Sequence, residues 1–355
     1  MRSKLAALAI AIPVAFAVQT AAIAAVTGQK VERIAPDRIA VTWTDAQPVD
    51  VYLADGPDEG VGKARLVSGQ DRSGRLELPA AATGRPYILL REVPGKAVVR
   101  VAERVLPLEQ GSNFRDIGGY PAAGGKHVRW GRIFRSGATP MLTDADVARV
   151  RALGLAELID LRSDEERILA PTRIDGVRYS AVGYPMSQIS GTGPKPFADA
   201  HGVYYQFPTL LAPQLRILFQ TLLAQTGPVV YNCSAGQDRT GFATAMVLSA
   251  LGVPRDVILA DYHLSTTYRR PEYEMPRIDP ARRSESAIAA MFIQGQQGDG
   301  KPRQPQPLYD ADHRALLAVA FEDVERRWGS VDAYLQKELG VGPAERARLR
   351  AAYLE

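Results

Sequence analysis

The residues best suited to chemistry in this sequence lie around its single cysteine. Between Cys233 and Arg239 stand five residues, and Thr240 follows; the five are Ser234, Ala235, Gly236, Gln237 and Asp238. A loop of this length before a helix turns several backbone N–H groups toward one point, where they bind a phosphate group. The planar guanidinium of Arg239 matches two phosphate oxygens. The spacing therefore predicts a phosphate site built from residues 234–240, with Cys233 at its base.

The cysteine itself has two interpretations. A lone cysteine is commonly a small buried hydrophobic residue. At the start of a helix and beside an arginine, however, a thiol ionises more readily than a free thiol and becomes a nucleophile at neutral pH. We expect the Thr240 hydroxyl to donate a hydrogen bond to the sulfur and Gly236 to let the backbone turn. The surroundings of Cys233 favour the nucleophile.

The elements on both sides of this loop position it. Apolar and β-branched residues over Pro228–Tyr231 predict a strand, and Thr240–Leu251 predicts a helix that Gly252 ends. A strand, a loop and a helix in this order place a site at the carboxyl end of a sheet in an α/β fold.

From about residue 108 the sequence alternates between strand and helix patterns. Thr143 and Ser163 each stand three positions before an acidic residue, Asp146 and Glu166, which is the pattern of a capping box. Further strands are expected at 128–134, 158–161 and 177–182, and a helix at 214–223. Residues 108–355 are therefore predicted to form an α/β domain.

A polar segment, 269–310, interrupts this pattern with many prolines and glycines. It predicts a loop-rich insertion with one helical piece near 287–293. A lid over the site and a plain surface excursion both stay open. Residues 311–355 predict two or three further helices.

The N-terminus has the pattern of an export signal over residues 1–25. Arg2 and Lys4 supply a positive start, residues 5–18 are almost wholly apolar, and 22–24 supply small residues for cleavage. The rival interpretation is a retained membrane anchor, but the apolar run is short for a membrane span. We expect cleavage, after which the exported protein, periplasmic or secreted, has no membrane span.

Residues 26–107 predict a small β-sandwich that resembles a fibronectin type III module. Short runs rich in β-branched or aromatic residues are separated by turn residues and lie at 38–43, 49–53, 85–90 and 98–101. No residue in this module suggests chemistry. We interpret it as a module that packs against the rest of the chain or docks a partner.

Composition excludes other classes of function. The 355 residues are 46% hydrophobic, which is enough for a large core. The 43 Lys and Arg residues against 39 Asp and Glu residues give a net charge of only +4, so we expect no nucleic-acid partner. The four histidines do not stand at metal-ligand spacing, and we expect neither a metal nor another cofactor.

The run CSAGQDRTG, residues 233–241, resembles the signature loop of the protein tyrosine phosphatase superfamily. Its AGxDRTG form is similar to that of bacterial tyrosine phosphatases related to a secreted mycobacterial enzyme of triple specificity. Four further stretches are similar to that branch, at 113–119, 131–136, 160–163 and 325–332. The resemblance covers about residues 108–350. It implies an α/β phosphatase fold with a central sheet of four to five strands flanked by helices.

The resemblance also implies two-step hydrolysis of phosphate monoesters through a phosphocysteine, without a metal. Cys233 attacks phosphorus, while Arg239 and the loop amides bind the phosphate oxygens. Enzymes of this branch use an aspartate of the loop as general acid, which corresponds to Asp238. Asp160 is the second candidate and Asp116 the third; the alternative for both is an anchoring role for arginines or backbone amides.

Other residues of the resemblance have less defined roles. Asn113 and Arg115 are expected either to support the loop or to bind the substrate. Two positions depart from the family pattern, because Asn232 stands where the family has His and Gln237 where it often has Lys. Both changes reduce the positive charge near the loop.

This lower charge bears on the substrate. Highly anionic inositides need more positive charge than Gln237 leaves, so we expect phosphotyrosine on a protein, or a small phosphate ester. A phosphoinositide or inositol phosphate phosphatase using the same loop is the alternative. A phosphate-binding pseudoenzyme is a second alternative, which the intact Cys233 disfavours because binding alone needs no thiolate.

Overall fold

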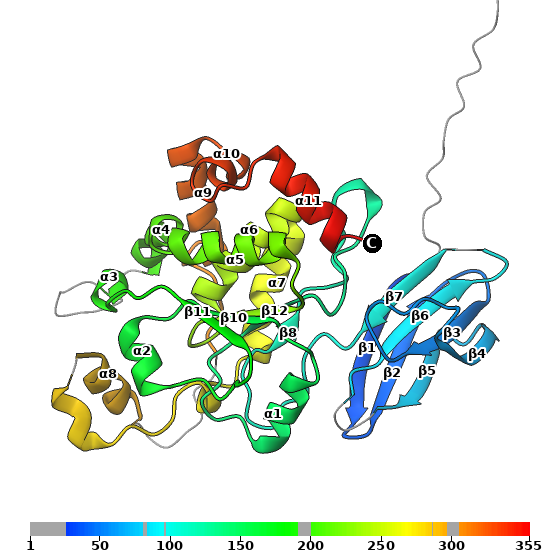
Figure 1. Ribbon diagram of the computed structural model, residues 1–355, viewed down its shortest axis with the longest axis horizontal. Coiled ribbons are helices and arrows are strands. Elements are labelled where there is room, and N and C mark those ends of the chain that lie inside the picture. The colour runs from blue at the N-terminus through cyan, green and yellow to red at the C-terminus, as the bar shows by residue number, and fades with distance from the viewer. Residues whose placement is uncertain (1–25, 81–83, 96, 191–199, 286, 297–304) are drawn as a thin grey trace, which may run out of the picture.

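A computed structural model describes residues 26–80, 84–95, 97–190, 200–285, 287–296 and 305–355 (Figure 1). The predicted export signal, residues 1–25, lies outside the described residues. Within those ranges, no helix combines the length and the apolar character that a membrane crossing requires.

The N-terminal strands form a sandwich of two antiparallel sheets, beside the larger unit in Figure 1. One sheet has the order β1 (Thr27–Ala35), β2 (Arg38–Thr44) and β5 (Arg75–Pro79). The other has the order β4 (Arg65–Asp71), β3 (Val49–Ala54), β6 (Tyr87–Glu92) and β7 (Val98–Ala102). The four apolar strands expected from the sequence are β2, β3, β6 and β7. Strands β1, β4 and β5 were missed because their many exposed polar residues weaken the β pattern.

The second unit contains a five-stranded sheet, which confirms the predicted α/β architecture with a preceding sandwich. Its order is β11 (Arg178–Ala181), β10 (Glu157–Asp160), β12 (Val229–Asn232), β9 (Ile133–Ser136) and β8 (Arg115–Asp116). Only β8, at one edge, is antiparallel to its neighbour. The carboxyl ends of the four parallel strands therefore meet at one edge of the sheet, as a site of this class requires.

Helices cover both faces of this sheet. One face packs against α5 (Ala212–Ala224) and α6 (Asp238–Leu251), with Ile159 and Tyr231 in that core. The other face packs against α1 (Asp144–Arg151), with Leu158 and Val230 in that core. Alternate residues of one strand thus serve opposite faces, as β geometry requires.

The remaining helices complete the larger unit. They are α2 (Asp164–Leu169), α3 (Ser187–Ser190), α4 (Ala200–Leu210), α7 (Arg255–Tyr268), α8 (Ala287–Gln296), α9 (Leu316–Trp328), α10 (Val331–Lys337) and α11 (Pro343–Tyr353). Both predicted capping boxes are present, at the starts of α1 and α2. In the predicted insertion, α8 packs its Ile288 and Ile293 against Leu169 and Tyr184, so this helix is docked beside α2.

Several boundaries differ from the sequence prediction by one or two residues, and two further differences bear on the site. The strand expected at 128–134 begins only at Ile133, because Gly131 has a left-handed φ of 74° and Trp130 turns into the core of the sandwich. The helix expected from Thr240 begins at Asp238. Asp238 and Arg239 therefore belong to the first turn of α6 rather than to a free loop.

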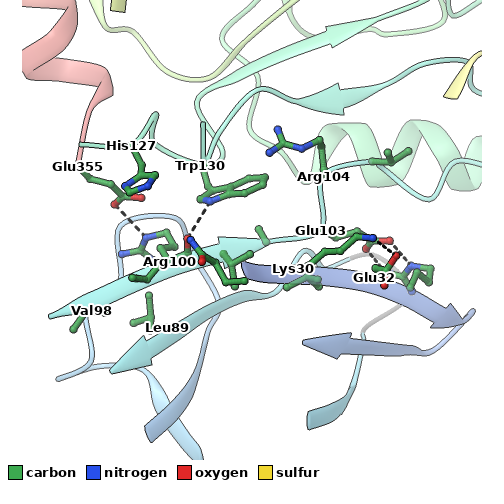
Figure 2. A pocket seen from close by; sticks show the side chains of 18 of the residues that line it. Lys30, Glu32, Leu89, Val98, Arg100, Glu103, Arg104, His127, Trp130 and Glu355 are labelled. Atoms are coloured by element: carbon green, nitrogen blue, oxygen red, sulfur yellow. Dashed lines mark hydrogen bonds and ion pairs between the residues drawn. The ribbon is translucent and has the colours of Figure 1, made fainter. Parts of the chain in front are cut away.

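An ion pair and a hydrogen bond connect the sandwich with the larger unit. Arg85 donates to Asp116 at 2.7 Å, and the Trp130 indole donates to the Arg100 carbonyl at 3.1 Å. Figure 2 shows Glu355 and Trp130 in contact with the strand that carries Arg100, and these residues, with His127, line a cavity of about 860 Å³. The sandwich thus contacts the larger unit at residues next to β8 and β9.

Candidate active site

Hydrogen bonds from Asn113 fix the conformation of the loop that follows Cys233. Cys233 directly follows β12 and is 2% exposed. Asn113, itself in a left-handed conformation, donates its amide to the carbonyls of Ala235 at 3.0 Å and Gly236 at 2.8 Å. Because these carbonyls are bound on the outside of the loop, its N–H groups remain available to an anion on the inside.

Gly236 makes this loop geometry attainable. Its φ is +65°, and a Cβ there would lie 2.5 Å from the backbone nitrogen of Gly137. Arg135, on β9, donates to the Gly236 carbonyl at 2.7 Å. The close approach of loop and strand therefore requires glycine at this position.

A buried network under the loop connects β8, β9 and α7. Asp261 accepts from Arg115 at 3.1 Å, Arg135 at 2.5 Å and the Tyr120 hydroxyl at 2.8 Å. Burial raises the pKa of Asp261, but the two arginines outweigh it and hold the pKa well below its usual range. Asp261 is thus an ionised counter-charge that fixes both arginines beneath the loop.

The sequence prediction missed Asp261, although one signal was present. Asp261 lies on the same helix face as Ile258, Tyr262 and Ser265, and all four are buried. A carboxylate at a core-facing position needs a cationic partner. Arg115 belongs to the same network and is fully buried, a position that agrees with the supporting role among the two expected for it.

Arg239 is fixed by a carboxylate from another element. Glu166 of α2 accepts from Arg239 Nη1 at 2.6 Å and from Nη2 at 2.7 Å, and the Ser234 hydroxyl donates to it at 2.5 Å. Arg239 also donates to the Tyr184 hydroxyl at 2.8 Å. Burial raises the pKa of Glu166, but Arg239 and the hydrogen bonds lower it to about 2. The guanidinium is therefore aimed before any ligand arrives.

Asp238 lies at the rim of the loop and is partly exposed. The Tyr204 hydroxyl of α4 donates to its Oδ1, and Gln237 Nε2 lies 3.2 Å from the same oxygen. The structure thus brings Cys233, Arg239 and Asp238 together at one end of β12.

Comparison with known proteins agrees with this geometry. Residues 106–355 match the model of the tyrosine phosphatase family. The chain belongs to this family.

Two relatives and one solved structure extend the comparison. The chain is 31% identical over 281 residues to a putative tyrosine-protein phosphatase of Cupriavidus necator, covering 76% of this chain and 94% of the relative. It is 31% identical over 282 residues to the triple specificity protein phosphatase PtpB of Mycobacterium tuberculosis, covering 68% and 96%. A crystal structure of Pseudomonas aeruginosa TpbA in complex with pTyr matches at 16% identity and a TM-score of 0.24, covering 49% of this chain and 90% of that chain. That last similarity is too low to carry an argument.

The other two candidate acids of the phosphatase serve as anchors. Asp160 is buried and binds the Arg162 guanidinium, with the shortest contact at 2.6 Å, and the Tyr179 hydroxyl at 2.9 Å. Asp116 accepts from Arg85 and from the backbone N–H groups of residues 118 and 131 at 2.7 and 2.6 Å. These contacts match the anchoring alternative for both carboxylates and leave Asp238 as the acid candidate beside the loop.

Two expectations for the loop need correction. Thr240 Oγ1 is buried and has no hydrogen-bond partner among the described residues, so it does not donate to the sulfur here. Gln237 does reduce the charge of the loop itself, but Arg269 of the neighbouring segment donates to Gln237 Oε1 at 2.7 Å. Arg269 is in turn paired with Glu274 at 2.8 Å. A cation therefore stands beside the loop, with its charge compensated.

Proposed function

We propose that this phosphatase hydrolyses phosphotyrosine through a covalent phosphocysteine on Cys233. Membership of the tyrosine phosphatase family makes the chain a phosphoric monoester hydrolase. The observation that carries the mechanism is the meeting of the Cys233 loop with an Arg239 that Glu166 already holds in place. A rigid arginine and inward N–H groups stabilise charge that develops on the phosphoryl oxygens in the transition state.

Cys233 and Asp238 then each act in both steps of the reaction. The Cys233 thiolate attacks phosphorus, and the bond to the leaving oxygen breaks with its electron pair on that oxygen, which takes a proton from Asp238. In the second step a water oxygen attacks phosphorus and gives a proton to Asp238. The sulfur then leaves with the electron pair of the S–P bond, which restores the thiolate.

The depth of the site supports an aryl phosphate as substrate. Cys233 is 2% exposed, so the phosphorus must reach below the surface on a long, narrow side chain. A phosphotyrosine ring supplies this length, and a short phosphoserine does not. The triple specificity in the name of PtpB belongs to that relative.

An inositol phosphate is the second candidate, and Arg269 is the observation that favours it. This cation stands beside Gln237 and would bind an additional anionic group. Both of its ion-pairing contacts with Glu274 are short, at 2.9 and 2.8 Å, so the carboxylate of Glu274 already neutralises the charge of Arg269. The balance therefore favours phosphotyrosine.

Location and partners are part of the proposal. The positive start, apolar run and small residues of segment 1–25 support export, which places the enzyme in a periplasm or outside the cell. The substrate is then a phosphorylated protein or small ester in that compartment. None of the side chains that we propose for catalysis lies in the described part of the sandwich. Its partly buried contacts with the larger unit support a packing role, and we propose docking of a partner as a second role.

A substrate panel tests the proposed function. Purified protein is incubated with phosphotyrosine and phosphoserine peptides and with inositol phosphates, with Cys233→Ser as the control. The expected result is vanadate-sensitive phosphate release, fastest from phosphotyrosine and absent in Cys233→Ser. Full activity of Cys233→Ser contradicts the mechanism, and faster release from inositol phosphates transfers the assignment to the second candidate.

A further inference from the structure

Tyr204 reaches the active site from a distant part of the chain. It lies on α4 and is only 2% exposed. Its hydroxyl contacts Asp238, 34 residues further along the chain, and Tyr262 of α7 at an O–O distance of 2.5 Å. Nothing in the resemblance to the family or in the loop motif assigns it a role.

The number of hydroxyl protons determines which group donates in each of these two hydrogen bonds. A tyrosine hydroxyl has one proton to donate. When Tyr204 donates to Oδ1 of Asp238, it has no proton left for Tyr262, so Tyr262 donates to the Tyr204 oxygen. Burial and the charge of Asp238 raise the pKa of Tyr204 well above its ordinary value. Tyr204 thus keeps its proton, and remains a hydrogen-bond donor, at every pH at which enzymes ordinarily work.

Packing restrains both tyrosine rings. The Tyr204 ring lies 4.9 Å from the Phe207 ring and meets the Tyr262 ring edge to face at 6.5 Å. The Tyr262 ring lies so close to Gly241, in the first turn of α6, that a Cβ there would come within 2.9 Å. The donor therefore has a fixed position relative to the helix that begins with Asp238.

The two oxygens of Asp238 are in different situations. Among the described residues, Oδ1 accepts from Tyr204 and from Gln237 Nε2 at 3.2 Å, whereas Oδ2 has only the longer contact with Gln237 Nε2, at 3.4 Å. The Gln237 amide is itself oriented, because Arg269 donates to its oxygen at 2.7 Å. The Tyr204 hydroxyl and the shorter Gln237 contact therefore restrain Oδ1, and Oδ2, with the weaker contact, is the oxygen suited to proton exchange.

We propose that Tyr204 is a positioning residue for the general acid: it binds Oδ1 of Asp238, so that Oδ2 exchanges the proton with the leaving oxygen. The inference rests on the proposed function. In the first step the proton moves from Asp238 Oδ2 to the leaving oxygen, while the P–O electron pair goes to that oxygen. In the second step Oδ2 takes a proton from the attacking water. Tyr204 keeps its own proton in both steps.

Substitution of the hydroxyl alone tests this role. Tyr204→Phe is assayed on aryl phosphates whose phenols range from weakly to strongly acidic. We expect kcat/KM to fall roughly 10- to 100-fold on phenyl phosphate. General acid catalysis accelerates such reactions by about 10²–10⁴-fold, and mispositioning the acid removes part of this acceleration. On dinitrophenyl phosphate it changes little, because that phenolate leaves without a proton.

Matched variants separate positioning from damage to the fold. The control is Tyr205→Phe, since Tyr205 is the next residue on α4 and is 44% exposed; its kcat/KM stays unchanged on every substrate. Asp238→Asn shows the same dependence on the leaving group, more steeply. Adding Tyr204→Phe to Asp238→Asn then causes no further loss, because residues that act as a unit are not additive.

Three outcomes overturn the inference. They are an equal loss on all substrates, no loss on phenyl phosphate, and a further loss of full size in the double variant. Failure of the proposed function is a separate result, in which the wild type and Cys233→Ser release phosphate equally from every substrate. Wild-type activity that depends on Cys233 but is indifferent to Tyr204 overturns the positioning role alone.

Discussion

Substituting Glu166 with glutamine removes one charge from the support of Arg239 while keeping the side-chain shape. The carboxylate accepts two hydrogen bonds from Arg239 and one each from the Ser234 hydroxyl and the Ser163 N–H. Glutamine retains one acceptor oxygen, which suffices for the helix cap. Its NH₂ group, however, faces the donors, and the guanidinium remains buried without a counter-charge.

The size of the effect follows from the pKa of Glu166. Burial opposes ionisation, but Arg239 lowers the pKa from 4.5 to about 2. At about 1.4 kcal/mol per pKa unit, this shift corresponds to roughly 3 kcal/mol of stability at neutral pH. Breaking a buried ion pair from one side costs about 3–5 kcal/mol, a similar amount. We expect Glu166→Gln to lower the free energy of unfolding by about 3 kcal/mol at neutral pH.

The effect of Glu166 has a defined pH dependence. Because the folded-state pKa lies below the ordinary value of 4.5, its contribution is complete above that pH and is lost as the pH falls toward about 2. Near pH 3 (about) more than half of the contribution is lost. The difference between wild type and Glu166→Gln therefore shrinks on acidification.

Urea unfolding followed by circular dichroism, at neutral pH and at about pH 3, measures the difference in free energy of unfolding between wild type and Glu166→Gln. Asp164→Asn is the matched control, because it makes the same change of charge in the first turn of α2 at a side chain that is 52% exposed and, among the described residues, forms its ion pair with Arg167. An exposed pair of this kind contributes about 0.5 kcal/mol or less. Equal destabilisation by the two variants, or a Glu166 effect that persists unchanged in acid, would refute the reasoning.

Three further substitutions test the surroundings of the loop. Asp261→Asn leaves two buried arginines without their counter-charge and should cost about 3–5 kcal/mol, measured as a lower urea midpoint; an unchanged midpoint contradicts the proposed support. Arg85→Met leaves Asp116 buried without its cation and should destabilise by a similar amount, with thermal melting as the assay and retained melting as the contrary result. Gly236→Ala places a Cβ against the neighbouring backbone and should lower kcat/KM on aryl phosphates by at least about 10-fold, whereas full activity shows that the loop tolerates the methyl group.

The sequence predicted the sheet, the sandwich and the position of the loop because each depends on local pattern. β-branched runs, capping boxes and helix-ending glycines act over a few residues. Strands β1, β4 and β5 were missed because their local β pattern is weak, whereas one strand boundary failed because of tertiary packing. The strand at 128–134 was predicted too long, because Trp130 enters the core of the other unit, and no local pattern shows this.

In the candidate site, too, some residues could be predicted from local sequence and others could not. The sequence by itself predicted the proposed nucleophile, the proposed phosphate-binding arginine and the proposed acid, since Cys233, Asp238 and Arg239 lie within seven consecutive residues and local geometry brings them together.

Only the tertiary structure decided what holds them. Glu166, Asp261 and Tyr204 come from three other helices, and their sequence neighbourhoods show a helix cap, a buried face and an aromatic residue, without naming a partner. A buried charge or hydroxyl must find a partner, but the chain determines which one only when distant elements pack together. The loop therefore specifies the chemistry, and the fold around it specifies the orientation of each reacting group.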